Sequence, residues 1–178
     1  AAHNNAPTRV SVATAVLRGT APGVEFGLTV GSGDLDRDGF DDVVVSAPFG
    51  EADGTYVFRG PFRPGEERAD EQADWIVRDG GRDAWLGSGV AIGDFDGDGV
   101  PGVALVQTRA GAGWIDVWRD PGQGADDGHV VLTTPQVQQY GSALGYDLDE
   151  DGDDDLMISG SDHVRVVLGS GLPEDPFE

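Results

Sequence analysis

The sequence predicts an all-β fold assembled from three similar units. An acidic loop recurs three times, starting at Asp34, Asp94 and Asp147, and a short β-branched or aliphatic run follows each copy. These runs are too short for helices and have the composition of buried strands. The chain also has 29 glycines and 10 prolines in 178 residues, a content typical of a turn-rich β protein.

The three loops share one pattern of oxygen ligands. Aspartate occupies loop positions 1, 3 and 5, and glycine occupies position 6, in residues 34–42, 94–102 and 147–155. Clustered carboxylates followed by a sharp turn suit Ca²⁺, and they would repel one another without a cation. The loops are not EF-hands, because position 12 holds Val45, Leu105 and Ile158 in place of glutamate.

We expect each loop to complete its ligand set with the carbonyl of position 7 and the carboxylate of position 9. The first loop then offers Asp34, Asp36, Asp38, the Phe40 carbonyl and Asp42. The third offers Asp147, Asp149, Asp151, the Asp153 carbonyl and Asp155. The second offers Asp94, Asp96, Asp98 and the Val100 carbonyl, but it has Gly102 at position 9. The sequence therefore predicts two strong Ca²⁺ sites and a weaker or more hydrated one in the second loop.

The repeat extends beyond the loops. Phe26-Gly27, Leu86-Gly87 and Tyr140-Gly141 precede the three loops, whose starts are 60 and 53 residues apart. Each unit holds about four short strands, and four strands at such a period are typical of a β-propeller blade. We expect a single domain over residues 1–178, with repeats at about 10–60, 73–120 and 128–171 and short polar arms at 1–8 and 172–178.

On these motifs the chain resembles the FG-GAP repeat of integrin alpha-subunit propellers and their bacterial relatives. The first unit carries the likeness best, with Phe26-Gly27, the acidic loop, and Ser46-Ala47-Pro48 where the family writes Gly-Ala-Pro. At the position of this tripeptide the second unit has Val106-Gln107-Thr108 and the third has Ser159-Gly160-Ser161, so both depart from the family pattern. The resemblance implies propeller blades with calcium-binding hairpin loops. It also implies a binding or structural module of an adhesion surface or larger assembly.

Charge and composition narrow the classes of partner. Acidic residues outnumber basic ones 33 to 11, and the six charges of three Ca²⁺ ions would bring the net charge from −22 to −16. Such acidity disfavours binding to nucleic acid and to anionic lipid. The chain has no cysteine and no apolar run of membrane-spanning length. Because weak extracellular-type calcium loops fill at roughly 0.1–1 mM, we expect a secreted, periplasmic or cell-surface protein whose signal peptide has been removed.

A catalytic interpretation finds little support in the sequence. His3, His129 and His163 lie in unlike contexts, and no hydrolase or nucleotide-binding motif occurs. We therefore expect a non-enzyme, with an accessory or catalytic domain of a secreted polysaccharide hydrolase or lyase as the alternative. The four tryptophans either pack between units or form a carbohydrate- or peptide-binding surface. They are Trp75, Trp85, Trp114 and Trp118.

Three units are too few for a propeller ring, which closes with four to eight blades. The chain begins with an outer-type strand at 10–17 and ends with the inner strands of its last unit. That permuted order allows the two ends of a propeller to pair. We expect apolar faces on the two end units, covered by a second copy or by another protein chain.

Overall fold

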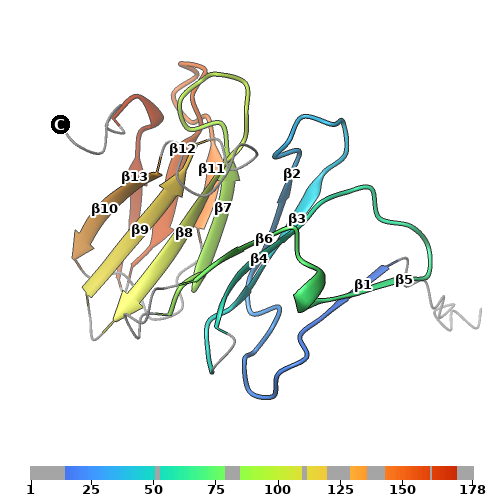
Figure 1. Cartoon of the computed structure of the whole chain (residues 1–178). Helices are drawn as coiled ribbons and strands as arrows, with labels where there is room; N and C mark the ends of the chain where they lie inside the picture. The colour runs from blue at the N-terminus through green and yellow to red at the C-terminus, as the bar shows by residue number, and fades with distance from the viewer. Residues whose placement is uncertain are drawn as a thin grey trace, which may run out of the picture.

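The computed structural model describes residues 15–50, 53–78, 85–109, 112–119, 129–135, 143–160 and 162–171. These residues form an all-β structure of several sheets with two short 3₁₀ turns, η1 (Asp70–Gln72) and η2 (Gly169–Gly171) (Figure 1). None of the described residues lies in a helix with the length and hydropathy that a bilayer crossing requires. The predicted all-β class is confirmed.

The first sheet is antiparallel, with the strand order β2-β3-β4-β6. Its strands are β2 (Val30–Gly33), β3 (Asp42–Ala47), β4 (Gly54–Phe58) and β6 (Trp75–Val77). The apolar run after the first acidic loop forms β3, which lies in the middle of the sheet and pairs Val44 with Val57 of β4. The acidic loop is thus the turn of the hairpin between β2 and β3.

The second and third sheets repeat this arrangement. The second has the order β10-β9-β8-β7, from β7 (Gly89–Gly93), β8 (Gly102–Arg109), β9 (Ala112–Trp118) and β10 (His129–Pro135). The third contains β11 (Ala143–Tyr146), β12 (Asp155–Ser159) and β13 (Val164–Val167) within the described residues. In both sheets the acidic loop again joins the first two strands.

Two runs pair outside the repeat in which the sequence placed them. The run at Trp75–Val77, expected to open the second repeat, pairs with β4 and completes the first sheet. Strand β10, expected to open the third repeat, pairs with β9 and completes the second sheet. The N-terminal strand β1 (Ala15–Arg18) does not join the last unit within the described residues; it pairs in parallel with β5 (Glu66–Ala69). The connector between β4 and β6 contains β5, and it leads the chain back so that β6 pairs with the edge of β4.

Glycines allow the first strands of the three sheets to approach one another. Strand β7 lies against β2 on one side and against β11 on the other. A Cβ atom at Gly31 of β2 would lie 3.0 Å from the Ile92 side chain of β7. A Cβ atom at Gly145 of β11 would lie 2.5 Å from the Ile92 carbonyl oxygen. A larger residue at either position would separate neighbouring sheets.

The core consists of apolar layers between the sheets. One layer joins the first and second sheets and includes Val44, Val57 and Leu105, and another joins the second and third and includes Val117 and Leu156. Fully burying one such side chain contributes about 1.5–3 kcal/mol. Interleaved layers of this kind hold the three acidic hairpins in a fixed relation to one another.

The two end sheets differ in how their outer faces are covered. Leu17, Val24 and Phe26 pack over the outer face of the first sheet, beside Tyr56 and Phe58. In the first unit, the chain's own N-terminal segment thus covers the apolar face that we expected a second copy or another chain to cover. The outer face of the third sheet is exposed and apolar. Its exposed residues are Leu144, Tyr146, Val164 and Val166.

Candidate metal centre

Backbone conformation gives the three loops one shape. Position 4 adopts a left-handed conformation in each loop, with φ values of 60°, 68° and 62° at Arg37, Gly97 and Glu150. The glycine at position 6 also has positive φ in each loop. Left-handed backbone is unfavourable for most side chains, and glycine adopts it at no steric cost. The repeated conformation turns the chain sharply, so that the side chains of positions 1, 3 and 5 lie on one side of the loop.

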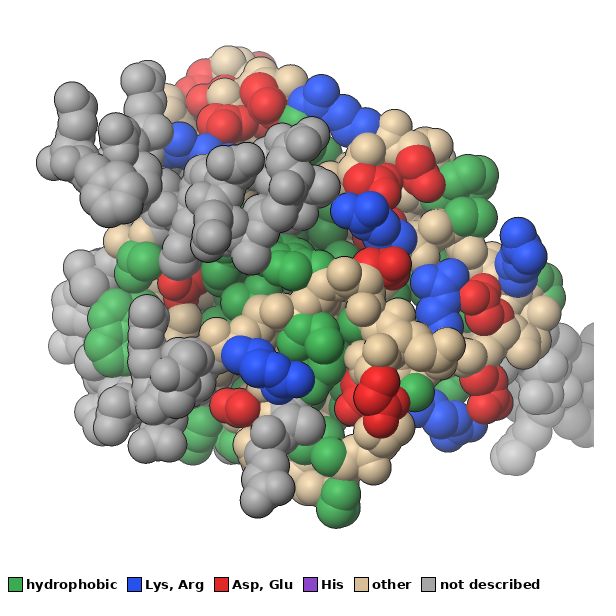
Figure 2. Space-filling model, viewed as in Figure 1, with side chains coloured by type: hydrophobic (Ala, Val, Ile, Leu, Met, Phe, Trp, Pro, Cys, Tyr) green, Lys and Arg blue, Asp and Glu red, His purple; other side chains and the backbone are tan. Residues whose placement is uncertain are grey.

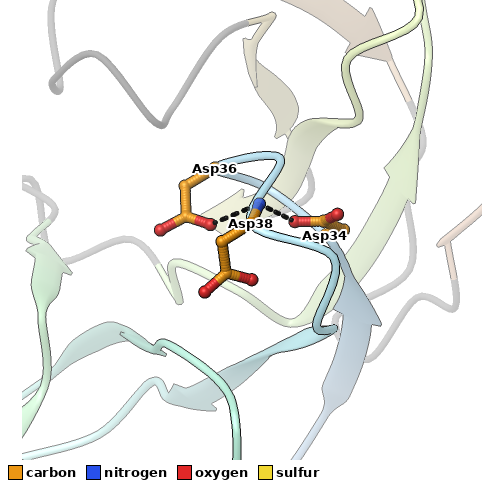
Figure 3. A group of neighbouring side chains, drawn as sticks. All are labelled: Asp34, Asp36 and Asp38. Carbon is orange, nitrogen blue, oxygen red and sulfur yellow. Dashed lines mark hydrogen bonds between the residues drawn. The ribbon is translucent and has the colours of Figure 1, made fainter.

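Hydrogen bonds to backbone amides order the carboxylates of the first loop. The amides of Asp38 and Gly39 donate to the two carboxylate oxygens of Asp34, at 3.0 and 2.9 Å. The amide of Asp38 also donates to Asp36 at 3.3 Å, as Figure 3 shows. The Asp38 carboxylate accepts from the Phe40 amide at 2.9 Å. The three carboxylates therefore gather around the turn that their own backbone makes.

The second and third loops repeat these bonds. Asp94 accepts from the Gly99 amide at 2.8 Å, and Asp147 accepts from the Gly152 amide at 3.2 Å. In every loop one oxygen from each of positions 1, 3 and 5 lies within 4.8 Å of the others. The structure thus brings together the three side chains that the sequence predicted for each site.

The position 9 aspartates anchor their loops. Asp42 and Asp155 are fully buried. Asp42 accepts from the amides of Leu35 and Gly60 at 3.2 and 2.9 Å, and Asp155 accepts from those of Leu148 and Gly169 at 2.9 and 3.0 Å. The grouped oxygens come from positions 1, 3 and 5. Metal ligation by position 9 stays a prediction, as does ligation by the carbonyls of position 7.

The second loop has no room for a position 9 carboxylate. A Cβ atom on Gly102 would lie 2.6 Å from the carbonyl oxygen of Trp118. The backbone at the end of β9, which pairs with β8, therefore occupies the space that a side chain at this position would need. The missing ligand reflects close backbone packing, which the loop sequence alone does not reveal.

Burial and mutual repulsion make the loop carboxylates costly to ionise without a cation. Burial raises the pKa of Asp42 and of Asp96, with further increases from neighbouring aspartates. Burial, followed by the charge of Asp151, also raises the pKa values of Asp149 and Asp153. A bound cation would reverse this effect, because an opposite charge nearby favours the ionised carboxylate.

The residues fit a hard divalent cation such as Ca²⁺. Three carboxylates converge in each loop, and Ca²⁺ binds oxygen ligands of this type at 2.3–2.6 Å. In the third loop, Oδ1 of Asp147 is buried and has no hydrogen-bond partner within the described chain. A buried polar atom without a protein partner is uncommon and indicates a bound water or ion at that position. The donor set and this one oxygen both point to a metal ligand role.

The structure also shows groups around the loops that sequence reasoning missed. Asp154 accepts a hydrogen bond from the Asp94 amide at 2.8 Å, and its own amide donates to the Asp94 carbonyl at 2.6 Å. The second and third loops are therefore joined. Three arginines approach the first two loops: Arg37, Arg59 and Arg119. These contacts cross between sheets or come from distant strands, so the loop motif carries no signal for them.

The aromatic residues mainly contribute to packing. The rings of Trp75 and Trp118 meet edge to face with centroids 5.7 Å apart, between the first and second sheets. Trp85 packs against Phe49 with centroids 5.3 Å apart. The packing interpretation is confirmed for these tryptophans. His163 contacts Asp162, whereas His3 and the side chain of His129 lie outside the described residues.

The chain is similar in sequence to known proteins. A family model described as FG-GAP repeat matches residues 26–58, which run from Phe26-Gly27 through the first loop to β4. Integrin alpha-3 of Mus musculus is 29% identical over 173 residues, covering 85% of this chain and 16% of the mouse protein. Integrin alpha ina-1 of Caenorhabditis elegans is 28% identical over 190 residues, covering 89% of this chain and 16% of the nematode protein. The chain thus spans about a sixth of the length of these relatives. It contains an FG-GAP repeat and is a distant homologue of integrin alpha subunits over most of its length.

Proposed function

We propose that the chain is a calcium-binding, non-catalytic module of the integrin-like propeller type that acts outside the cell. The observation that carries this proposal is the presence of three carboxylate clusters of one geometry, one at the first hairpin of each of the three antiparallel sheets. Each cluster is ordered by its own backbone amides, which suits a structural ion more than a reacting group. The likeness to integrin alpha subunits supports the extracellular assignment.

The sheets are proposed to act as blades. Their first strands lie side by side, and glycines allow close approach there, as expected where blades converge on a common axis. A closed ring needs four to eight blades, so this part of the chain requires further sheets to complete one.

The third sheet is proposed as the surface that a further sheet covers. Equivalent cross-strand pairs face the next sheet in each unit: Val44 with Val57, Ala104 with Val117, and Met157 with Val166. The first pair lies largely in the layer between the first and second sheets, and the second pair in the layer between the second and third. In the third pair Val166 is 49% exposed. A sheet of the same type, from a second copy or from another chain, would complete the series.

Chelation tests the calcium role. We expect the melting temperature of the protein to fall when EDTA replaces Ca²⁺, because metal binding to the native loops is linked to folding. Mg²⁺ at the same concentration should restore little of the lost melting temperature, since Mg²⁺ demands a smaller octahedral shell of ligands. Identical melting in Ca²⁺ and in EDTA would contradict a structural calcium role.

A further inference from the structure

We propose that arginines act as built-in counter-cations for the first and second loops, so that the third loop is the one that depends on bound Ca²⁺. This inference rests on the proposed calcium function and assigns different metal requirements to three loops of similar sequence. It concerns residues outside the loop motif, at equivalent positions in the three sheets.

The first observation is the residue that follows the third strand of each sheet. Phe58, Trp118 and Val167 occupy equivalent positions, since each pairs with the first apolar residue after the acidic loop. The next residues in the chain are Arg59, Arg119 and Leu168. Two units therefore place an arginine beside the loop, and the third places an apolar side chain there.

Both arginines reach the aspartate at position 3 of their loop. Nε of Arg59 lies 3.3 Å from Oδ2 of Asp36, and Nε of Arg119 lies 3.9 Å from Oδ2 of Asp96. The Arg119 side chain is only 13% exposed, so solvent and salt screen its charge less than they would on an open surface. Position 3 is one of the three grouped oxygen donors, so each guanidinium lies beside a predicted metal ligand.

A third arginine adds to the charge at the second loop. Arg37 belongs to the first loop, but its Nη2 lies 3.5 Å from Oδ1 of Asp98 and 3.4 Å from the Asp98 carbonyl oxygen. The second loop thus faces Arg37 and Arg119 with only three ligand aspartates, because Gly102 takes position 9. Figure 2 shows arginine side chains interspersed with acidic ones over the face in view.

The third loop differs in both charge and partners. Its ligand positions hold four aspartates, and Glu150, Asp153 and Asp154 add further negative charge. Within the described part of the chain, no arginine forms an ion pair with a carboxylate of this loop. The chain has no lysine, so all 11 of its basic residues are arginines. The buried Asp147 oxygen without a partner also belongs to this loop.

A guanidinium beside a ligand carboxylate has two opposite effects. It stabilises the metal-free loop, because it neutralises part of the clustered negative charge. It also weakens Ca²⁺ binding, because it repels the divalent ion and competes for the carboxylate oxygen. A residue that only supports the fold would change metal-free stability and metal affinity in the same direction. A substitution that changes metal-free stability and Ca²⁺ affinity in opposite directions therefore identifies a counter-cation.

Two reciprocal substitutions test the proposal, Arg119→Leu and Leu168→Arg. The amide resonances of Gly39, Gly99 and Gly152 report the three loops separately during a Ca²⁺ titration, since each amide donates to the position 1 aspartate. We expect Arg119→Leu to tighten Ca²⁺ binding at Gly99 about three- to tenfold and to lower the melting temperature in EDTA. Leu168→Arg should weaken binding at Gly152 by a similar factor and raise the melting temperature in EDTA.

A matched control is Arg18→Leu, which removes the same charge from an exposed ion pair with Glu67 away from the loops. It should change no loop affinity by more than about twofold. Unchanged affinities in both reciprocal variants, or affinity and metal-free stability changing together, would overturn the counter-cation role. If Arg119→Leu does not fold, Leu168→Arg alone decides between these outcomes. Failure of all three glycine amides to respond to Ca²⁺ in the unmodified protein would instead refute the proposed function.

Discussion

At the scale of single residues, the loops depend on two kinds of aspartate. Those at positions 1, 3 and 5 gather oxygens at the turn, whereas those at position 9 are buried and bind backbone amides on both sides of the hairpin. The loop motif identified the three aspartates that the structure brings together in each loop. It could not reveal the anchoring contacts, because the amide of Gly169 comes from the chain after β13, 14 residues beyond Asp155.

Replacing Asp155 with alanine should destabilise the protein even without metal. The substitution leaves the amides of Leu148 and Gly169 without their carboxylate acceptor, at a cost of about 2–4 kcal/mol. Denaturant unfolding in EDTA measures this loss separately from metal ligation. Glu67→Ala, an exposed control, should change the free energy of unfolding by less than about 0.5 kcal/mol. An equally small effect for Asp155→Ala would contradict the anchoring role.

Restoring the missing aspartate of the second loop should not restore a strong site. Gly102→Asp places a Cβ atom 2.6 Å from the Trp118 carbonyl oxygen, so the strands must move apart to accept it. We expect a loss of stability of about 1–3 kcal/mol and no tighter Ca²⁺ binding at the Gly99 amide. A stable variant with tighter binding would show that this position has room for a ligand.

At the scale of strands and sheets, the sequence predicted the hairpins better than their pairing partners. The β-branched runs after the loops form β3, β8 and β12 as expected. The run that forms β6 was also recognised, but the connector before it decides which sheet it joins. The parallel pair of β1 and β5 joins Ala15 to Glu66, and such distant pairing leaves no local pattern in the sequence.

The close approach of β7 and β11 depends on a glycine. Gly145→Ala would place a Cβ atom 2.5 Å from the Ile92 carbonyl oxygen, in backbone that cannot easily move aside. We expect this substitution to lower the free energy of unfolding by at least about 2 kcal/mol, by separating the second and third sheets. Gly171→Ala is a suitable control, because no atom lies near its added Cβ. Equal stability of the two variants would argue against tight packing of the first strands.

At the scale of the whole molecule, the two ends of the stack of sheets are unequal. The N-terminal segment covers the first sheet, and the apolar face of the third sheet is exposed. The sequence predicted apolar strands on both faces of each unit, which led to the expectation of association. It could not show that residues 17–26 cover one end, because their contacts with Tyr56 and Phe58 join residues far apart in the sequence.

The exposed face predicts association through the third sheet. Light scattering at micromolar concentration with Ca²⁺ present should give a mass above the 18.6 kDa of one chain. Val166→Asp should abolish that association, because it places a charge where Val166 is half exposed beside Met157. A mass of one chain for the unmodified protein at all concentrations would exclude self-association and leave a different chain as the covering partner.

The central claim is that the three aspartate loops bind Ca²⁺, and calorimetric titration of the metal-free protein tests it most directly. The account predicts at least two Ca²⁺ ions bound, with the weakest binding in the second loop. A variant carrying Asp147→Asn, Asp149→Asn and Asp151→Asn should lose one strong site and keep the other. No heat of binding at millimolar Ca²⁺, or the same number of ions bound by the variant, would contradict the assignment of these loops as calcium sites.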